Sequence, residues 1–224
     1  MSWILQNFEL IVSLSLAHLR QCLLALTLGF AIALILGWLA ERVKPLRTLL
    51  VLGTGLLYTI PSLALLMILP AATGMSAISE ANLVTALTIY AVAIMTRSVV
   101  DGLDSVGRET RQAAKAMGYG QFRRLAEVEL PLAGPVILSG LRVTAVSTIS
   151  LGTVGILVGV RNLGYLFTNG LQRRIIAEVF AGILAVAVLA LIVDLTLILL
   201  GRWLMPWNRL MQKSGIGQAV GGPR

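Results

Sequence analysis

Long apolar runs separated by short polar segments dominate this chain of 224 residues. Residues 21–40 are uncharged, which is about the length at which a helix crosses roughly 30 Å of hydrocarbon. Residues 48–79 carry no charge, and Pro61 predicts a spanning helix over 48–70 that is kinked at this proline. The runs 81–96 (extended toward Leu103), 143–160 and 179–201 predict three further spans. We therefore expect an all-α, polytopic membrane protein with about five transmembrane helices, five to six in all.

The two ends of the chain differ from this apolar middle. Residues 1–19 place Ile4, Leu5, Phe8, Ile11 and Val12 at helical spacing, which favours an amphipathic helix in the membrane interface over a sixth span. Residues 205–224 end in a glycine-rich stretch without apolar periodicity, and we expect a flexible cytoplasmic tail. Residues 20–204 are then the membrane domain.

Composition and charge fit a membrane protein and exclude other classes. Hydrophobic residues make up 57% and charged residues only 12%, about half of what a soluble domain carries. The net charge of +8 comes without a basic stripe interleaved with aromatics, which argues against a nucleic-acid binder. Placing the amino terminus outside puts 14 of the 18 Lys and Arg residues on the cytoplasmic side, as the positive-inside rule requires. The four left outside are Arg20, Arg161, Arg173 and Arg174.

A polar island interrupts the apolar runs and predicts a cytoplasmic loop over about 104–135. Of the 28 charged residues, 11 lie between Arg97 and Glu129. The pattern predicts a short helix over 105–117 that ends at Gly118, and a second over 121–129 that is stopped by Pro131. On charge alone the loop could equally be a solvated connector.

The spacing within this loop resembles the cytoplasmic signature of permease subunits of ATP-binding-cassette (ABC) importers. The residues that carry the resemblance are Ala113, Ala114, Gly118, Val128, Leu130 and Pro131, with Gln112 where the signature has Glu. The resemblance implies a type I importer fold and a loop that couples to the ATPase. The chain has no Gly-rich phosphate loop with Lys-Ser/Thr, so ATP and Mg would be used by a partner and no cofactor is expected on this chain.

A narrower resemblance lies in the second span. Residues 59–66, TIPSLALL, are similar to a segment of permeases that import osmoprotectants such as glycine betaine, choline or carnitine. This resemblance implies a multi-pass subunit of the bacterial inner membrane that works with two ATPase subunits, a second permease copy or paralogue and an external solute-binding protein. Arg161 and Asn162 replace two glycines of the family, and Tyr58 replaces a common Gln.

Candidate residues for a translocation path or hinge are Tyr58, Thr59, Pro61, Ser62 and Asp194. Pro61 removes a backbone donor, so it marks either a hinge or a static packing kink. Asp194 is the sole acidic residue deep in a predicted span, so it should face protein or water, either attracting a cation or pairing within the bundle. No nucleophile with a base, carboxylate pair or metal-ligand spacing is evident in the spans, and we expect neither catalytic nor metal residues.

Two rival functions remain open at this point. An ABC permease for methionine or another amino acid would share the five spans and the cytoplasmic signature. A secondary transporter driven by an ion gradient would use Asp194 as its coupling carboxylate.

Overall fold

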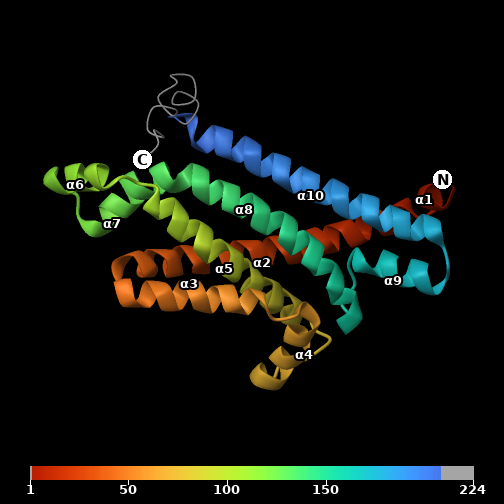
Figure 1. Ribbon diagram of the computed structural model, residues 1–224. Coiled ribbons are helices and arrows are strands. Elements are labelled where there is room, and N and C mark those ends of the chain that lie inside the picture. The colour runs from red at the N-terminus through yellow and green to blue at the C-terminus, as the bar shows by residue number, and fades with distance from the viewer. Residues whose placement is uncertain (1, 208–224) are drawn as a thin grey trace, which may run out of the picture.

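The computed structural model describes residues 2–207 as helices joined by short turns, with no strand within that range. Four long helices run side by side along the molecule: α2 (Phe8–Arg42), α5 (Glu80–Asp104), α8 (Leu130–Gly152) and α10 (Ile176–Leu204) (Figure 1). All four are long and apolar enough to cross a membrane, α8 together with the helical turns on either side of it. A bent pair, α3 (Lys44–Tyr58) with α4 (Ser62–Thr73), can be counted as a fifth span. The predicted all-α class and span number are confirmed.

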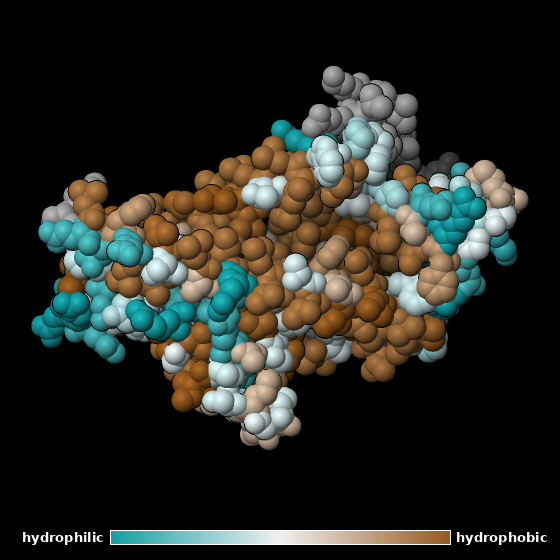
Figure 2. Space-filling model, turned by 180° about the vertical axis from the view of Figure 1, so that it is seen from behind, coloured by the Kyte–Doolittle hydropathy of each residue, from teal (hydrophilic) through white to brown (hydrophobic). Residues whose placement is uncertain are grey.

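The shorter helices gather at the two ends of the bundle. At one end lie α6 (Arg108–Ala116) and α7 (Gln121–Arg124), followed by a π-helical turn, η1 (Leu125–Glu129) (Figure 1). At the other lie α1 (Ser2–Gln6) and α9 (Gly164–Gln172), which follows a 3-10 turn, η2 (Thr153–Val158). Figure 2 shows a broad hydrophobic band between polar ends, as expected for a protein that spans a membrane.

Helix α5 is the centre of the bundle because small residues let its neighbours approach closely. A Cβ atom on Gly29 of α2 would lie 2.4 Å from the Ala91 Cβ of α5, and one on Gly140 of α8 would lie 2.2 Å from the Ser98 Cβ. Small residues at such crossings allow van der Waals packing where lipid offers no hydrophobic drive between helices. By contrast, α10 leaves most of its apolar side chains exposed, as a lipid-facing helix does.

The amino-terminal boundary differs from the prediction. We expected residues 1–19 to form a separate segment, but α2 continues without a break from Phe8 to Arg42, about 52 Å in length. No proline or glycine lies between Phe8 and the start of the first apolar run, so nothing in the backbone stops the helix there. Whether its outer part lies in the membrane interface stays a prediction. The predicted tail 205–224 lies outside the described residues except for its first three.

The second span is broken rather than kinked. Helices α3 and α4 meet at an angle of 109°, so 48–70 is not one gently bent helix (Figure 1). Pro61 stands between the two helices as the N-cap residue of α4, with an extended backbone. A residue before proline avoids the helical region, and three residues between the helices are enough to redirect the chain.

The fourth span begins earlier than predicted. Pro131 does not stop a helix, because α8 starts at Leu130 and Pro131 occupies its first turn, directly after the π-helical turn η1. The turn η1 joins α7 to α8, so residues 121–158 form one helical rod. Consequently, Arg142 lies in the middle of a membrane helix and not in the cytoplasmic segment where the sequence pattern put it.

Candidate functional site

The polar island folds into a compact knuckle, defined here as α6, the turn at Gly118, α7 and η1. Gly118 has φ +83°, and its N–H donates to the Lys115 carbonyl at 3.0 Å while the Tyr119 N–H donates to the Ala114 carbonyl at 3.1 Å. This pair of bonds is the Schellman arrangement, which needs a residue in the left-handed region and favours glycine. The predicted end of the first helix at Gly118 is therefore confirmed, although the helix begins at Arg108 and not at Ser105.

The signature residues occupy different faces of the knuckle. Ala114 is buried, whereas Gln112 and Ala113 face outward. Val128, Leu130 and Pro131 are half-buried along η1 and the first turn of α8. The exposed side chains of Ala113 and Ala116 are short, so another molecule can come close to the backbone of α6 at these positions.

Charged side chains fasten the knuckle to the bundle. The Arg111 guanidinium donates to the Glu41 carboxylate at the end of α2 and to the Leu103 carbonyl of α5. Glu129, which is only 3% exposed, accepts from the Arg124 Nε at 2.6 Å, and its carboxylate lies 3.9 Å from the Arg111 Nε. The knuckle is therefore joined to α2 by an ion pair and to α5 by a hydrogen bond to a backbone carbonyl.

Sequence reasoning did not assign roles to Glu41, Arg111 or Arg124 in this network. One signal was available, because Glu41 directly follows the apolar run 21–40 and thus marks an acid at the membrane edge near a basic loop. Which arginine pairs with which acid depends on how the knuckle folds back, and spacing along the chain does not determine that.

The predicted hinge residues lie together at the break between α3 and α4. The Tyr90 hydroxyl of α5 donates to the Ile60 carbonyl at 2.6 Å, and the Thr59 hydroxyl donates to the Leu56 carbonyl at 2.7 Å. Tyr58, Thr59 and Pro61 are exposed, and the Tyr58 ring packs edge-on against Tyr90 with centroids 6.1 Å apart. Ser62 begins α4. Tyr90 of α5 therefore contacts the break on one side, and the other side of the break is exposed.

Asp194 is not near this break but pairs across the bundle. The Arg142 Nε and Nη2 atoms of α8 donate to the two Asp194 carboxylate oxygens of α10 at 2.6 and 2.8 Å. This confirms pairing within the bundle, one of the two alternatives for Asp194. A bidentate pair satisfies a carboxylate that would be costly in hydrocarbon.

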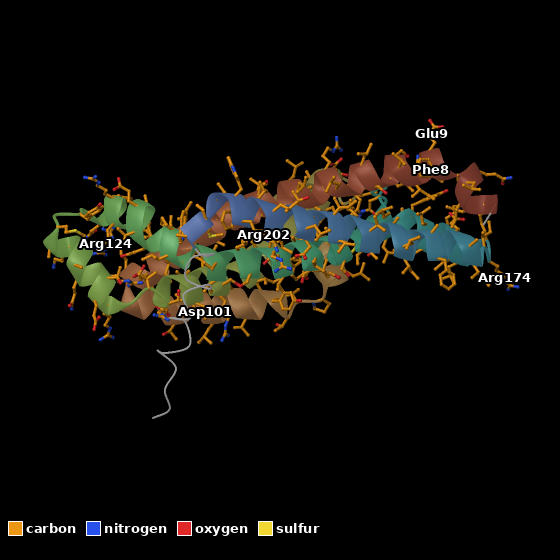
Figure 3. The ribbon with its side chains drawn as sticks, turned by 90° about the horizontal axis from the view of Figure 1, so that it is seen from above. Phe8, Glu9, Asp101, Arg124, Arg174 and Arg202 are labelled. Carbon is orange, nitrogen blue, oxygen red and sulfur yellow. The ribbon has the colours of Figure 1, made fainter. Side chains whose placement is uncertain are left out.

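A neutral polar cluster fastens the opposite end of the molecule. The buried Asn162 amide donates to the Gln21 Oε1 of α2 at 3.2 Å and to the Gly152 carbonyl at 2.8 Å, and its oxygen accepts from the Gly164 N–H at 2.9 Å. Arg161 beside it is exposed, as expected for a cation on the outer turn. Figure 3 places Arg124 at the knuckle end and Arg174 with Glu9 at the opposite end.

The described residues contain no group of three or more His, Cys, Asp or Glu side chains arranged to hold a metal ion. The described polar features are thus an outward-facing knuckle, a broken helix and a half-buried ion pair.

The sequence matches the family described as "Binding-protein-dependent transport system inner membrane component" over residues 29–209. It is 34% identical to the osmoprotectant import permease protein OsmW of Salmonella typhimurium, over 86% of this chain and 90% of that protein. It is 33% identical to the glycine betaine/carnitine/choline transport system permease protein OpuCD of Bacillus subtilis, over 76% of this chain and 74% of that one.

Solved structures share the fold at lower identity. A chain of the inward-facing methionine ABC transporter MetNI superposes with a TM-score of 0.77 at 21% identity, covering 89% of this chain and 98% of that chain. A chain of an amino acid ABC transporter with histidines superposes with a TM-score of 0.69 at 18% identity, covering 91% and 96%. These likenesses concern the architecture of the helices.

Proposed function

Because this chain belongs to the family of inner membrane components of binding-protein-dependent transport systems, we propose that it is the permease subunit of an ATP-driven importer for an osmoprotectant. The solute class is that of glycine betaine, choline and carnitine. The observation that carries this proposal is the identity of 28–34% to permeases named for these solutes, spread over most of the chain.

The knuckle is the surface through which ATPase subunits act. Gln112 and Ala113 face outward from a short helix whose end is defined by Gly118, so a groove on another protein can receive it closely. ATP and Mg are used by that partner. Closure of the ATPase pulls on the knuckle, and the Arg111 and Glu129 network passes the displacement to α2 and α5.

The translocation path forms between this chain and a second permease, either another copy or a paralogue. The break at Pro61 with Tyr58, Thr59 and Ser62 lies on the open side of the bundle and acts as the hinge. An external solute-binding protein delivers the solute at the end where α1 and α9 lie.

Two alternatives make different use of the same residues. The amino-acid importer reading draws support from the shared architecture, which extends across solutes, whereas the relatives with higher identity are named for osmoprotectants. The ion-coupled reading needs Asp194 free to exchange a cation, and its carboxylate already accepts two hydrogen bonds from Arg142.

The deciding experiment purifies the tagged chain from membranes with its companions and reconstitutes the assembly in liposomes. We expect an ATPase to co-purify, and uptake of radiolabelled glycine betaine but not of methionine once ATP and the binding protein are supplied. Uptake that persists without ATP would contradict the ATP-driven mechanism. Methionine uptake in place of betaine would contradict the solute class.

A further inference from the structure

An apolar groove opens beside the knuckle, and we name it the inner groove. Leu34, Ile35 and Trp38 of α2 form one wall, Phe122 and Leu125 the other, and residues of α5 the floor. Its cavity volume is about 260 Å³. Ile35 and Phe122 are more than 60% exposed, so the groove faces away from the packed core. Such a surface lacks polar groups that would hold water.

The positively charged side chain of Arg42 lies at the open end of the inner groove. The Arg42 guanidinium lies 4.7 Å from the centre of the Trp38 ring and 5.9 Å from that of Phe122, and these two rings are 5.3 Å apart. Stacking uses the face of the guanidinium and leaves its edge N–H groups available for an anion. Among residues 2–207, no acidic side chain forms an ion pair with Arg42, which is exposed.

The inner groove lies at the depth of a membrane interface. The uncharged run of the first span ends at Ala40, and Arg42 is the last residue of α2. Leu34 is eight residues earlier, about 12 Å deeper along the helix axis. Tryptophan and arginine at the end of a span are the usual anchors at the lipid headgroup level. The groove therefore runs from the headgroup level into the hydrocarbon.

We propose that the inner groove binds an anionic phospholipid, with its phosphate on Arg42 and one acyl chain along Trp38, Ile35 and Leu34. The apolar walls match the chain, and the exposed guanidinium, which pairs with no acidic side chain within residues 2–207, matches the negative headgroup. A soluble protein partner would reach the open end but not the part of the groove that lies in the apolar band. This binding goes beyond solute transport and does not depend on which solute is carried.

The bound lipid contacts the moving part of the transporter. Phe122 and Leu125 belong to the knuckle, while Trp38 belongs to a spanning helix. The Trp38 and Phe122 rings pack against each other with centroids 5.3 Å apart, so an acyl chain that lies along both rings touches the knuckle and the bundle at once. The lipid thus becomes part of the joint that also contains the Arg111 network.

The test uses the full-length chain with Trp38 as its only tryptophan, made by Trp3→Phe, Trp203→Phe and Trp207→Phe. It is reconstituted in phosphatidylcholine bilayers that contain increasing fractions of brominated phosphatidylglycerol or brominated phosphatidylcholine, and quenching of Trp38 fluorescence is recorded. We expect half-maximal quenching at a roughly five-fold lower fraction of the anionic lipid, the ratio that one basic contact supplies.

Three variants make the result specific. Arg42→Gln should remove the preference for the anionic lipid, and Arg42→Lys, which keeps the charge but not the planar stack, should retain part of it. Arg202→Gln removes an equal charge on α10, outside the groove, and should leave the preference intact. Equal quenching by both lipids, loss of preference in Arg202→Gln as well, or Trp38 that neither lipid quenches because protein covers it would each overturn the proposal.

Discussion

The two ends of the bundle are fastened by different chemistry. At the knuckle end, charged side chains join helices: Arg111 bridges Glu41 and Glu129, and Arg47 pairs with Asp104. At the opposite end an exposed pair, Arg20 with Glu80, joins α2 to α5, but the buried joint is made by neutral amides, because Asn162 and Gln21 join the turn before α9 to α2 and α8. Asn162 is fully buried, whereas Arg111 and Glu41 are 22% and 18% exposed.

The difference follows from the cost of burying charge. A fully buried ion pair must recover a desolvation penalty of several kcal/mol per ion, while a buried amide needs only its hydrogen bonds. Water still reaches Arg111 and Glu41, so their pairing carries a smaller desolvation cost, whereas Asn162 and Gln21 meet where water does not reach.

The largest effect should come from breaking the charged end at Arg111. Arg111→Ala leaves Glu41 without its ion-pair partner and the buried Glu129 with Arg124 alone, and we expect a loss of about 3 kcal/mol in the free energy of unfolding, measured by denaturant titration in detergent. Arg108→Ala is the matched control, because Arg108 is exposed on the same helix and forms no ion pair within residues 2–207. Equal losses in both variants would contradict the bridging role.

A smaller loss should follow from breaking the neutral end at Asn162. Asn162→Ala removes three hydrogen bonds from a buried cluster, and we expect a loss of about 2 kcal/mol by the same titration. The neighbouring variant Arg161→Ala changes an exposed side chain and should be nearly neutral. If Asn162→Ala proved harmless, the opposite end would be held by packing and not by amides.

A substitution at Gly118 tests the contribution of the backbone conformation at the knuckle end, because an added Cβ atom would strain the backbone without touching other atoms. A Cβ atom there meets nothing within 4 Å, so Gly118→Ala should cost only the left-handed conformation, about 1 kcal/mol. It should also weaken recovery of the ATPase in pull-down from membranes. Gly120→Ala has equal room and an ordinary φ of −65°, and recovery should be unchanged. Identical behaviour of the two variants would show that the Schellman turn is not what shapes the docking surface.

The smallest effect should come from the exposed pair at the knuckle end. Arg47 and Asp104 are 43% and 41% exposed, so water and salt screen them, and Arg47→Gln should cost less than about 1 kcal/mol. That difference should vanish at high salt, whereas the loss in Arg111→Ala should persist. Unfolding titrations of both variants at low and high ionic strength make this comparison directly. A salt-independent Arg47→Gln effect would mean that this pair is more enclosed than its exposure indicates.

The apolar periodicity of the sequence was sufficient to predict much of the fold. It predicted the all-α class, about five spans and the end of a helix at Gly118, because these depend on composition and on single residues with strong local preferences. It placed the bend of the second span at Pro61 but not its sharpness, and it wrongly predicted that Pro131 stops a helix. Pro61 stands at a 109° break, and Pro131 sits inside the first turn of a continuous helix.

The sequence did not determine which charged side chains form ion pairs with one another. It identified Asp194 as a carboxylate that needs a partner, but only the packing of α10 on α8 showed that the partner is Arg142, 52 residues away. In the same way, Gln112, Ala113 and Ala114 formed a recognisable pattern, while Glu41, Arg111 and Glu129 became a network only when the knuckle folded against α2 and α5. Local preference and hydrophobicity act along the chain, whereas an ion pair requires two side chains to meet in space, and the tertiary structure alone decides which ones meet.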